Sequence, residues 1–145
     1  MSEVPQILLQ HHLKKLRLPT FMAEYQKQAH QCAAENRDHV HYLSRLAELE
    51  LIERERRMVE RRIKAAKFPA VKSLDSFDFK AMPSLNKPMV MELARCEYLD
   101  RFENVIALGP SGTGKTHIAL GLGLAACQKG LKVRFITAAS LVHEL

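Results

Sequence analysis

The chain has 145 residues, about the size of one average domain. Hydrophobic residues make up 47% and charged residues 26%, which excludes a chain that is disordered throughout. No apolar run approaches the ~18 residues of a membrane span, and three cysteines without paired spacing exclude a disulfide framework. The net charge of +6 favours a polyanionic partner. The first five residues carry no basic leader, so the expected compartment is the cytoplasm.

Helical patterns fill the first 67 residues. An early proline suits a first helical turn, the leucines after it recur at spacings of three and four, and Pro19 ends this segment. Thr20 is predicted to cap a second helix, and Asp38 to cap a third that runs to about Lys67. We therefore expect a helical, basic domain over residues 1–67 that binds DNA or a partner.

The sequence changes character at residue 68. Prolines and two phenylalanines indicate a linker with short extended pieces, and a short helix is predicted over residues 87–99. The apolar run at 104–108 then predicts a buried strand, residues 117–128 a buried helix, and residues 132–137 a second strand. This order predicts that residues 68–145 form the N-terminal part of an α/β domain, with only its first two strands and the helix between them.

A glycine loop lies between the first predicted strand and the buried helix. It matches Gly-x-x-x-x-Gly-Lys-Thr, the P-loop pattern, in which backbone N–H groups and a helix N-terminus surround phosphate oxygens. Lys115 is predicted to reach the β- and γ-phosphates of ATP, and the Thr116 hydroxyl to bind Mg²⁺. A coincidental glycine turn would leave the strand and helix around it unexplained. The predicted nucleotide-binding residues are Gly109, Pro110, Ser111, Gly112, Thr113, Gly114, Lys115 and Thr116.

The densest positive charge lies in the basic stretch from Arg54 to Lys67, which holds seven bases and two acids. Four of the bases are three, four and three residues apart, so they share one helix face that is predicted to contact the phosphate backbone of DNA. A solvated face, with the two acids paired to neighbouring bases, is the alternative and stays open. The predicted DNA-binding residues are Arg54, Arg57, Arg61 and Lys64.

The chain resembles the IstB-like ATP-binding proteins, which are helper ATPases of bacterial insertion sequences and relatives of the DnaC helicase loaders. The resemblance covers essentially the whole chain and is clearest over residues 99–124, in Phe77-Asp78-Phe79, and in Leu16-Arg17-Leu18-Pro19. It implies an AAA+ module that binds ATP and Mg²⁺, self-associates on double-stranded DNA, and recruits or regulates a transposase. The glycine loop carries over as the nucleotide site, and the basic stretch more loosely as a DNA contact.

The resemblance has one gap. Members of this family continue past the glycine loop into a half that holds a Walker B Asp-Glu pair, a sensor residue and an arginine finger, and these 145 residues hold no counterpart. The expectation is a truncated or fragmentary member that contains no catalytic residue, binds nucleotide weakly at most, and shows no appreciable ATP hydrolysis. The alternatives are a DnaC-like helicase loader, a catalytically inactive DNA-binding fragment, and a small-molecule kinase, which the helical first half disfavours.

Overall fold

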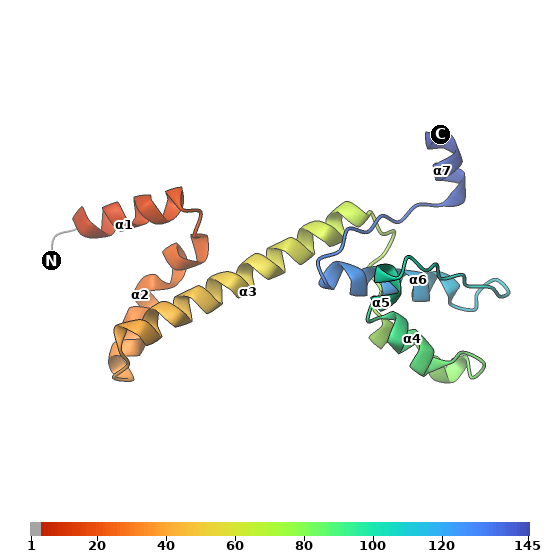
Figure 1. Cartoon of the computed structure of the whole chain (residues 1–145), viewed down its shortest axis with the longest axis horizontal. Coiled ribbons are helices and arrows are strands. Elements are labelled where there is room, and N and C mark those ends of the chain that lie inside the picture. Colours follow the sequence, from red (N-terminus) through yellow and green to blue (C-terminus); the bar gives the residue numbers. More distant parts are fainter. Residues whose placement is uncertain (1–3) are drawn as a thin grey trace. The chain divides into compact units, whose positions relative to one another are not determined.

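The structure is a computed structural model that describes residues 4–145; residues 1–3, on which the expectation of no basic leader partly rests, lie outside the described residues. The chain divides into two compact units, Met1–Arg57 and Met58–Leu145. The elements, labelled in Figure 1 where there is room, are α1 (Val4–Lys15), α2 (Pro19–Ala34), α3 (His39–Ala66), the 3₁₀ turns η1 (Leu74–Ser76) and η2 (Phe79–Ala81), α4 (Lys87–Leu93), α5 (Glu97–Asp100), α6 (Lys115–Gln128) and α7 (Ala138–Glu144).

The first unit contains α1, α2 and the first part of α3, close to the three helices expected from the sequence. Asp38 accepts a hydrogen bond from the His41 backbone N–H at 2.9 Å, which confirms its predicted role at the start of α3. Leu13, Cys32 and Leu46 are buried, one from each helix. The Tyr42 hydroxyl also donates to the Tyr25 carbonyl oxygen at 2.8 Å and so ties α3 to α2.

The start of α2 is capped from α3, so the prediction that Thr20 caps it is wrong. Helix α2 begins at Pro19, and the preceding Leu18 has no side chain that accepts a hydrogen bond. The Glu50 carboxylate instead accepts the backbone N–H groups of Thr20 at 2.8 Å and Phe21 at 3.1 Å. Glu50 is only 3% exposed, so a buried negative charge lies against the positive end of the α2 dipole.

Two arginines of the basic stretch complete this cap. Arg54 and Arg57 each place a guanidinium nitrogen 3.4 Å from Glu50 Oε1, and Arg54 also donates to the Arg17 carbonyl oxygen at 2.9 Å. Burial raises the pKa of Glu50, but the hydrogen bonds from Phe21 and Thr20 and the charge of Arg54 outweigh it. The pKa of Glu50 therefore lies below the ordinary value for a glutamate.

We predict that Glu50→Gln lowers the free energy of unfolding at pH 7 by about 1–3 kcal/mol, because buried partners lose a charge-assisted contact. A depressed folded pKa gives stability that is complete above the unfolded pKa of about 4.3 and is lost as pH falls through the folded value. Urea unfolding at pH 7 and at pH 3 should therefore show the gap between wild type and Glu50→Gln shrinking at low pH. Glu48→Gln, an exposed change on the same helix, is the control, and equal stabilities of all three proteins at pH 7 would contradict the cap.

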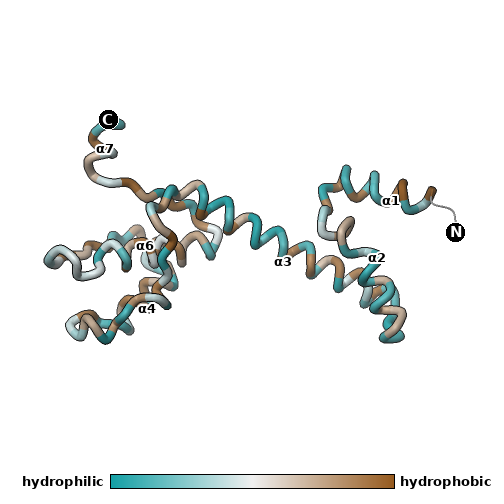
Figure 2. The backbone as a smooth tube through the Cα atoms, turned by 180° about the vertical axis from the view of Figure 1, so that it is seen from behind, coloured by the Kyte–Doolittle hydropathy of each residue, from teal (hydrophilic) through white to brown (hydrophobic). Residues whose placement is uncertain are grey.

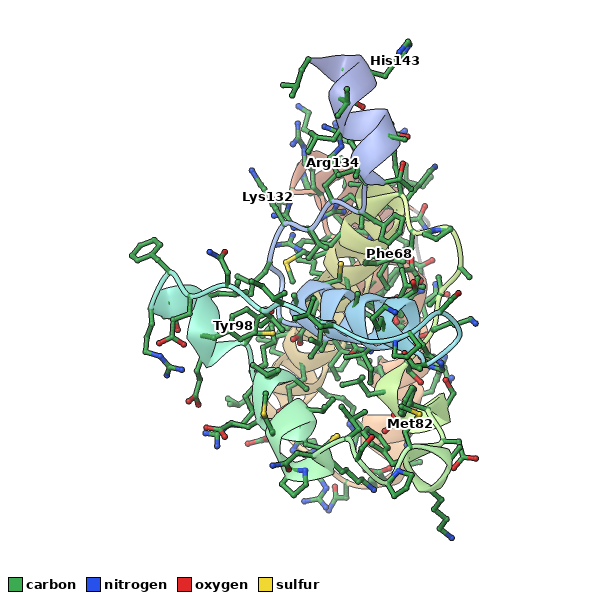
Figure 3. All side chains as sticks on the ribbon, turned by 90° about the vertical axis from the view of Figure 1, so that its right-hand side faces the viewer. Phe68, Met82, Tyr98, Lys132, Arg134 and His143 are labelled. Carbon is green, nitrogen blue, oxygen red and sulfur yellow. The ribbon has the colours of Figure 1, made fainter. Side chains whose placement is uncertain are left out.

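The second unit packs around α6, whose tube is white to brown over most of its length in Figure 2. Leu122 of α6 forms a core cluster with Leu74 and Val90, and partly buried Phe79 and Ile118 pack against it. Other side chains lie directly on the α6 backbone. A Cβ atom added at Gly121 would lie 2.6 Å from Leu74 Cδ2, and one at Gly123 would lie 2.9 Å from Phe68, the ring labelled in Figure 3. The segment from residue 68 to 79 is thus held against bare helix backbone.

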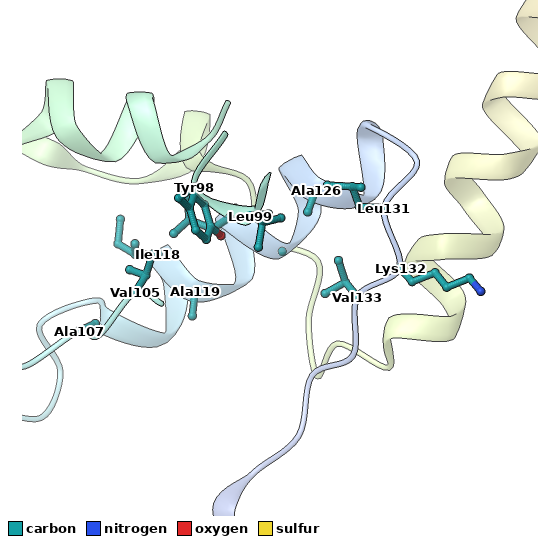
Figure 4. Close-up of a pocket in the computed structure, with 12 residues that line it drawn as sticks. Tyr98, Leu99, Val105, Ala107, Ile118, Ala119, Ala126, Leu131, Lys132 and Val133 are labelled. Atoms are coloured by element: carbon teal, nitrogen blue, oxygen red, sulfur yellow. The ribbon is translucent and has the colours of Figure 1, made fainter. Parts of the chain in front are cut away.

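The predicted α/β fold for residues 68–145 is wrong, because the structure contains no strand and no sheet within residues 4–145. A strand forms only where a second segment offers its backbone groups to a ladder. Segments 104–108 and 132–137 both lie near α6 but do not pair (Figure 4). Ile106 and Leu108 are 79% and 90% exposed, and the Phe135 N–H donates to the Ala66 carbonyl oxygen at the end of α3. Thr137 then caps α7, a helix that the sequence analysis does not predict.

Candidate functional site

The glycine loop, residues 109–116, leads directly into the first turn of α6. Gly112 and Gly114 have φ angles of +78° and +90°, a left-handed conformation that glycine adopts without steric cost. Gly114 is the N-cap residue of α6, and Lys115 and Thr116 are the first two residues of the helix. The first backbone N–H groups of a helix lack partners inside it, and the helix dipole makes this end attractive to an anion.

The Lys115 side chain lies against its own loop. Its ammonium group donates to the carbonyl oxygens of Gly109 and Pro110, the second at 2.7 Å. Thr113 Oγ1 also donates to the Pro110 carbonyl oxygen, at 2.8 Å. This oxygen therefore accepts two hydrogen bonds from within the loop. An ammonium held here has three N–H donors and no acceptor, and it can exchange carbonyl oxygens for phosphate oxygens without leaving the loop.

A cavity of about 440 Å³ lies at the loop. Six of the eight predicted nucleotide-binding residues, from Ser111 to Thr116, border it, while Gly109 and Pro110 hold the Lys115 ammonium group. Lys72 and His117 border the same cavity, and neither is among the site residues predicted from the sequence. His117 adjoins the motif and could have been suspected, but nothing in the sequence indicates that Lys72 comes near the loop. Thr116 is exposed and borders the cavity.

The 68–79 segment packs beside the site, through contacts of Phe77 with His117 and Gly114. The His117 ring lies edge-on to Phe77, with ring centroids 5.1 Å apart, and Phe77 in turn packs edge-on to Phe79 at 4.8 Å. A Cβ atom at Gly114 would lie 2.5 Å from the Phe77 ring, so this glycine is needed for close packing as well as for its φ angle. Phe77 therefore packs on both Phe79 and His117, directly beside the glycine loop.

The four predicted DNA-binding residues lie on α3 but in different surroundings. Arg54 and Arg57 pair with Glu50 in the first unit. Arg61 and Lys64 belong to the second unit and are exposed, and no ion pair or hydrogen bond of their side chains is found within the described residues. The spacing of the four residues is therefore compatible with two roles: fold stability for the first pair, and an open positive surface for the second.

A second hollow, of about 370 Å³, lies along α6. Figure 4 shows Val105 and Ala107 at one side of it, and Leu131 and Val133 at the other, with Ala119 of α6 between them. Its lining is almost wholly apolar, and the Lys132 side chain points away from it. This groove therefore lacks the charges that a phosphate group requires, in contrast to the cavity at the glycine loop.

Residues 4–145 contain neither a cluster of metal-binding side chains nor a helix suited to span a membrane. Among these residues, no group of three or more histidine, cysteine or acidic side chains is placed to hold a metal ion. No helix in this part of the chain is long and apolar enough to cross a membrane. Cys32, Cys96 and Cys127 are buried and free, and burial raises the pKa of the Cys96 and Cys127 thiols.

Comparison with known proteins places the chain among the ATP-binding proteins of insertion sequences. The model of the IstB-like ATP binding protein family matches residues 11–145, and the chain belongs to this family. It is 38% identical over 131 residues to "Insertion sequence IS5376 putative ATP-binding protein" of Geobacillus stearothermophilus, covering 90% of this chain and 52% of that protein. It is 35% identical over 133 residues to "Insertion sequence IS21 putative ATP-binding protein" of Pseudomonas aeruginosa, covering 92% and 50%.

A third relative, from Sinorhizobium fredii, is "Putative insertion sequence ATP-binding protein y4iQ/y4nD/y4sD", with 38% identity over 134 residues. That match covers 92% of this chain and 45% of the relative. The chain thus spans about half the length of these curated relatives, and the matched half includes the glycine loop.

Proposed function

We propose that the chain binds ATP with Mg²⁺ at the glycine loop and acts as an ATP-binding helper of DNA transposition. The observation that carries this proposal is the cavity at the start of α6, which Lys115, Thr116 and the left-handed Gly114 border together. The cavity offers an ammonium group, a hydroxyl and a helix N-terminus to a phosphate chain. Membership of the IstB-like family supports ATP as the nucleotide.

Each group has a distinct part in binding. The Lys115 ammonium group is suited to the β- and γ-phosphates, since it lies inside the loop and carries a full positive charge. The exposed Thr116 hydroxyl would provide one oxygen ligand to Mg²⁺, and a bound Mg²⁺ neutralises phosphate charge. Ser111 and Thr113 border the cavity and present hydroxyl groups around the phosphate chain.

We predict that Lys115→Ala weakens binding of a fluorescent ATP analogue by about tenfold or more, because a charge-assisted contact of about 1.5–3 kcal/mol is lost. Binding is measured by titration in the presence of Mg²⁺. Lys132→Ala is the control, because this lysine is exposed, lies in the same unit and does not border the cavity. Equal affinities of wild type and Lys115→Ala would remove the glycine loop as the nucleotide site.

We further propose that the helper contacts double-stranded DNA through α3, self-associates on that DNA, and recruits or regulates a transposase. The net charge of +6 and the exposed side chains of Arg61 and Lys64 support the DNA contact. The names of the relatives, all proteins of insertion sequences, support the connection with transposition. Arg54 and Arg57 contribute less to this DNA contact, because both are paired with Glu50.

The DNA contact predicts a salt dependence that can be assigned to two residues. Replacing Arg61 and Lys64 together by Gln should flatten the log–log salt slope of duplex DNA binding by about 1.8, at 0.9 per lost phosphate contact. Binding is followed by fluorescence anisotropy across a salt series, with circular dichroism as the check of folding. A double variant at Lys14 and Lys15 removes the same charge elsewhere and should change the slope much less. A folded Arg61/Lys64 variant with the wild-type slope would contradict a DNA contact at this pair.

A further inference from the structure

A second lysine borders the cavity at the glycine loop. Lys72 precedes η1 and lies far from the loop in sequence, yet it borders the same cavity as Ser111–His117. Two lysines, one histidine and the start of α6 thus surround this space. Among the described residues that border it, none carries a carboxylate. The charge of the cavity therefore suits a ligand with more than one negative group.

His117 fixes the backbone next to Lys72. Its Nε2 lies 2.9 Å from the Ser73 carbonyl oxygen, and because a carbonyl only accepts, Nε2–H is the donor. The Ser76 hydroxyl lies 3.2 Å from the same nitrogen and itself donates to Ser73 at 2.9 Å. Ser73 follows Lys72 directly, and His117 follows the Lys115-Thr116 pair. One side chain therefore ties the start of α6 to the residue beside the second lysine.

Phe77 provides a second attachment of the same segment. Its ring packs on Gly114, the N-cap of α6, and edge-on to His117. The segment is thus held at both Ser73 and Phe77, so the backbone around Lys72 has little freedom to move away from the loop. The Lys72 side chain is exposed and can reorient toward a ligand, while its backbone is held in place.

We propose that Lys72 is a second phosphate-binding cation of the nucleotide site, and that His117 positions it. This inference rests on the proposed nucleotide-binding function and adds a second cation, from outside the glycine loop, to the same phosphate site. Lys115 belongs to the glycine loop itself, whereas Lys72 belongs to the 68–79 segment, and both residues line the cavity. A chain of phosphates can meet both ammonium groups, whereas a nucleoside without phosphate meets neither.

The test is a double-mutant cycle on the full chain, with a fluorescent ATP analogue as the probe. Lys72→Gln should weaken binding about three- to tenfold, as expected for an exposed charge-assisted contact. His117→Ala should weaken binding by a smaller factor, and the double variant should bind no more weakly than Lys72→Gln, because His117 acts through Lys72. His117→Gln, whose amide N–H can replace the Nε2 donor, should restore the affinity. Binding of a fluorescent adenosine without phosphates should not change in Lys72→Gln.

Lys80→Gln is the matched control, since Lys80 lies in the same part of the chain, is exposed, and does not border the cavity. Lys115→Ala, measured in parallel, separates the two levels of the proposal. If Lys115→Ala binds as wild type does, the nucleotide site itself is wrong. If Lys115→Ala is weakened but Lys72→Gln is not, only the role of Lys72 is overturned. Losses that multiply in the double variant, in proteins shown to be folded by circular dichroism, would overturn the positioning role of His117.

Discussion

The second unit depends on the close approach of large side chains to the bare backbone of α6. Leu74 lies on Gly121 and Phe68 on Gly123, at positions where any Cβ atom would overlap them. A glycine inside a helix lowers stability by about 1 kcal/mol relative to alanine. Burial of Leu74, in a cluster with Val90 and Leu122, offsets this loss.

This contact also determines what surrounds the glycine loop. The segment seated on α6 continues from Leu74 to Ser76 and Phe77, which meet His117 and Gly114 at the start of the same helix. The packing of the unit and the cavity at the loop therefore share one element. A substitution in the middle of α6 that displaces this segment is therefore expected to alter the cavity, although it contacts no residue of the loop.

Local signals in the sequence predicted the local features of the structure. Asp38 at the start of α3 and the buried character of α6 both follow from rules that act within a few residues. The features that were missed depend on contacts between distant residues. Glu50 caps α2 from another helix, Lys72 reaches the loop through packing, and residues 104–108 are apolar yet have no partner strand. An apolar run predicts burial, but it forms a strand only if its backbone hydrogen-bonds to a second segment.

The stability of Gly121→Ala in urea shows whether the second unit is built on a bare face of α6. A Cβ atom there would lie 2.6 Å from the Leu74 side chain and 3.2 Å from its backbone nitrogen. Overpacking of this kind predicts a loss of about 1–3 kcal/mol in the free energy of unfolding, and a smaller loss in a Leu74→Ala background. A gain of about 1 kcal/mol, the ordinary benefit of alanine over glycine in an unobstructed helix, would contradict close packing of Leu74 on the α6 backbone.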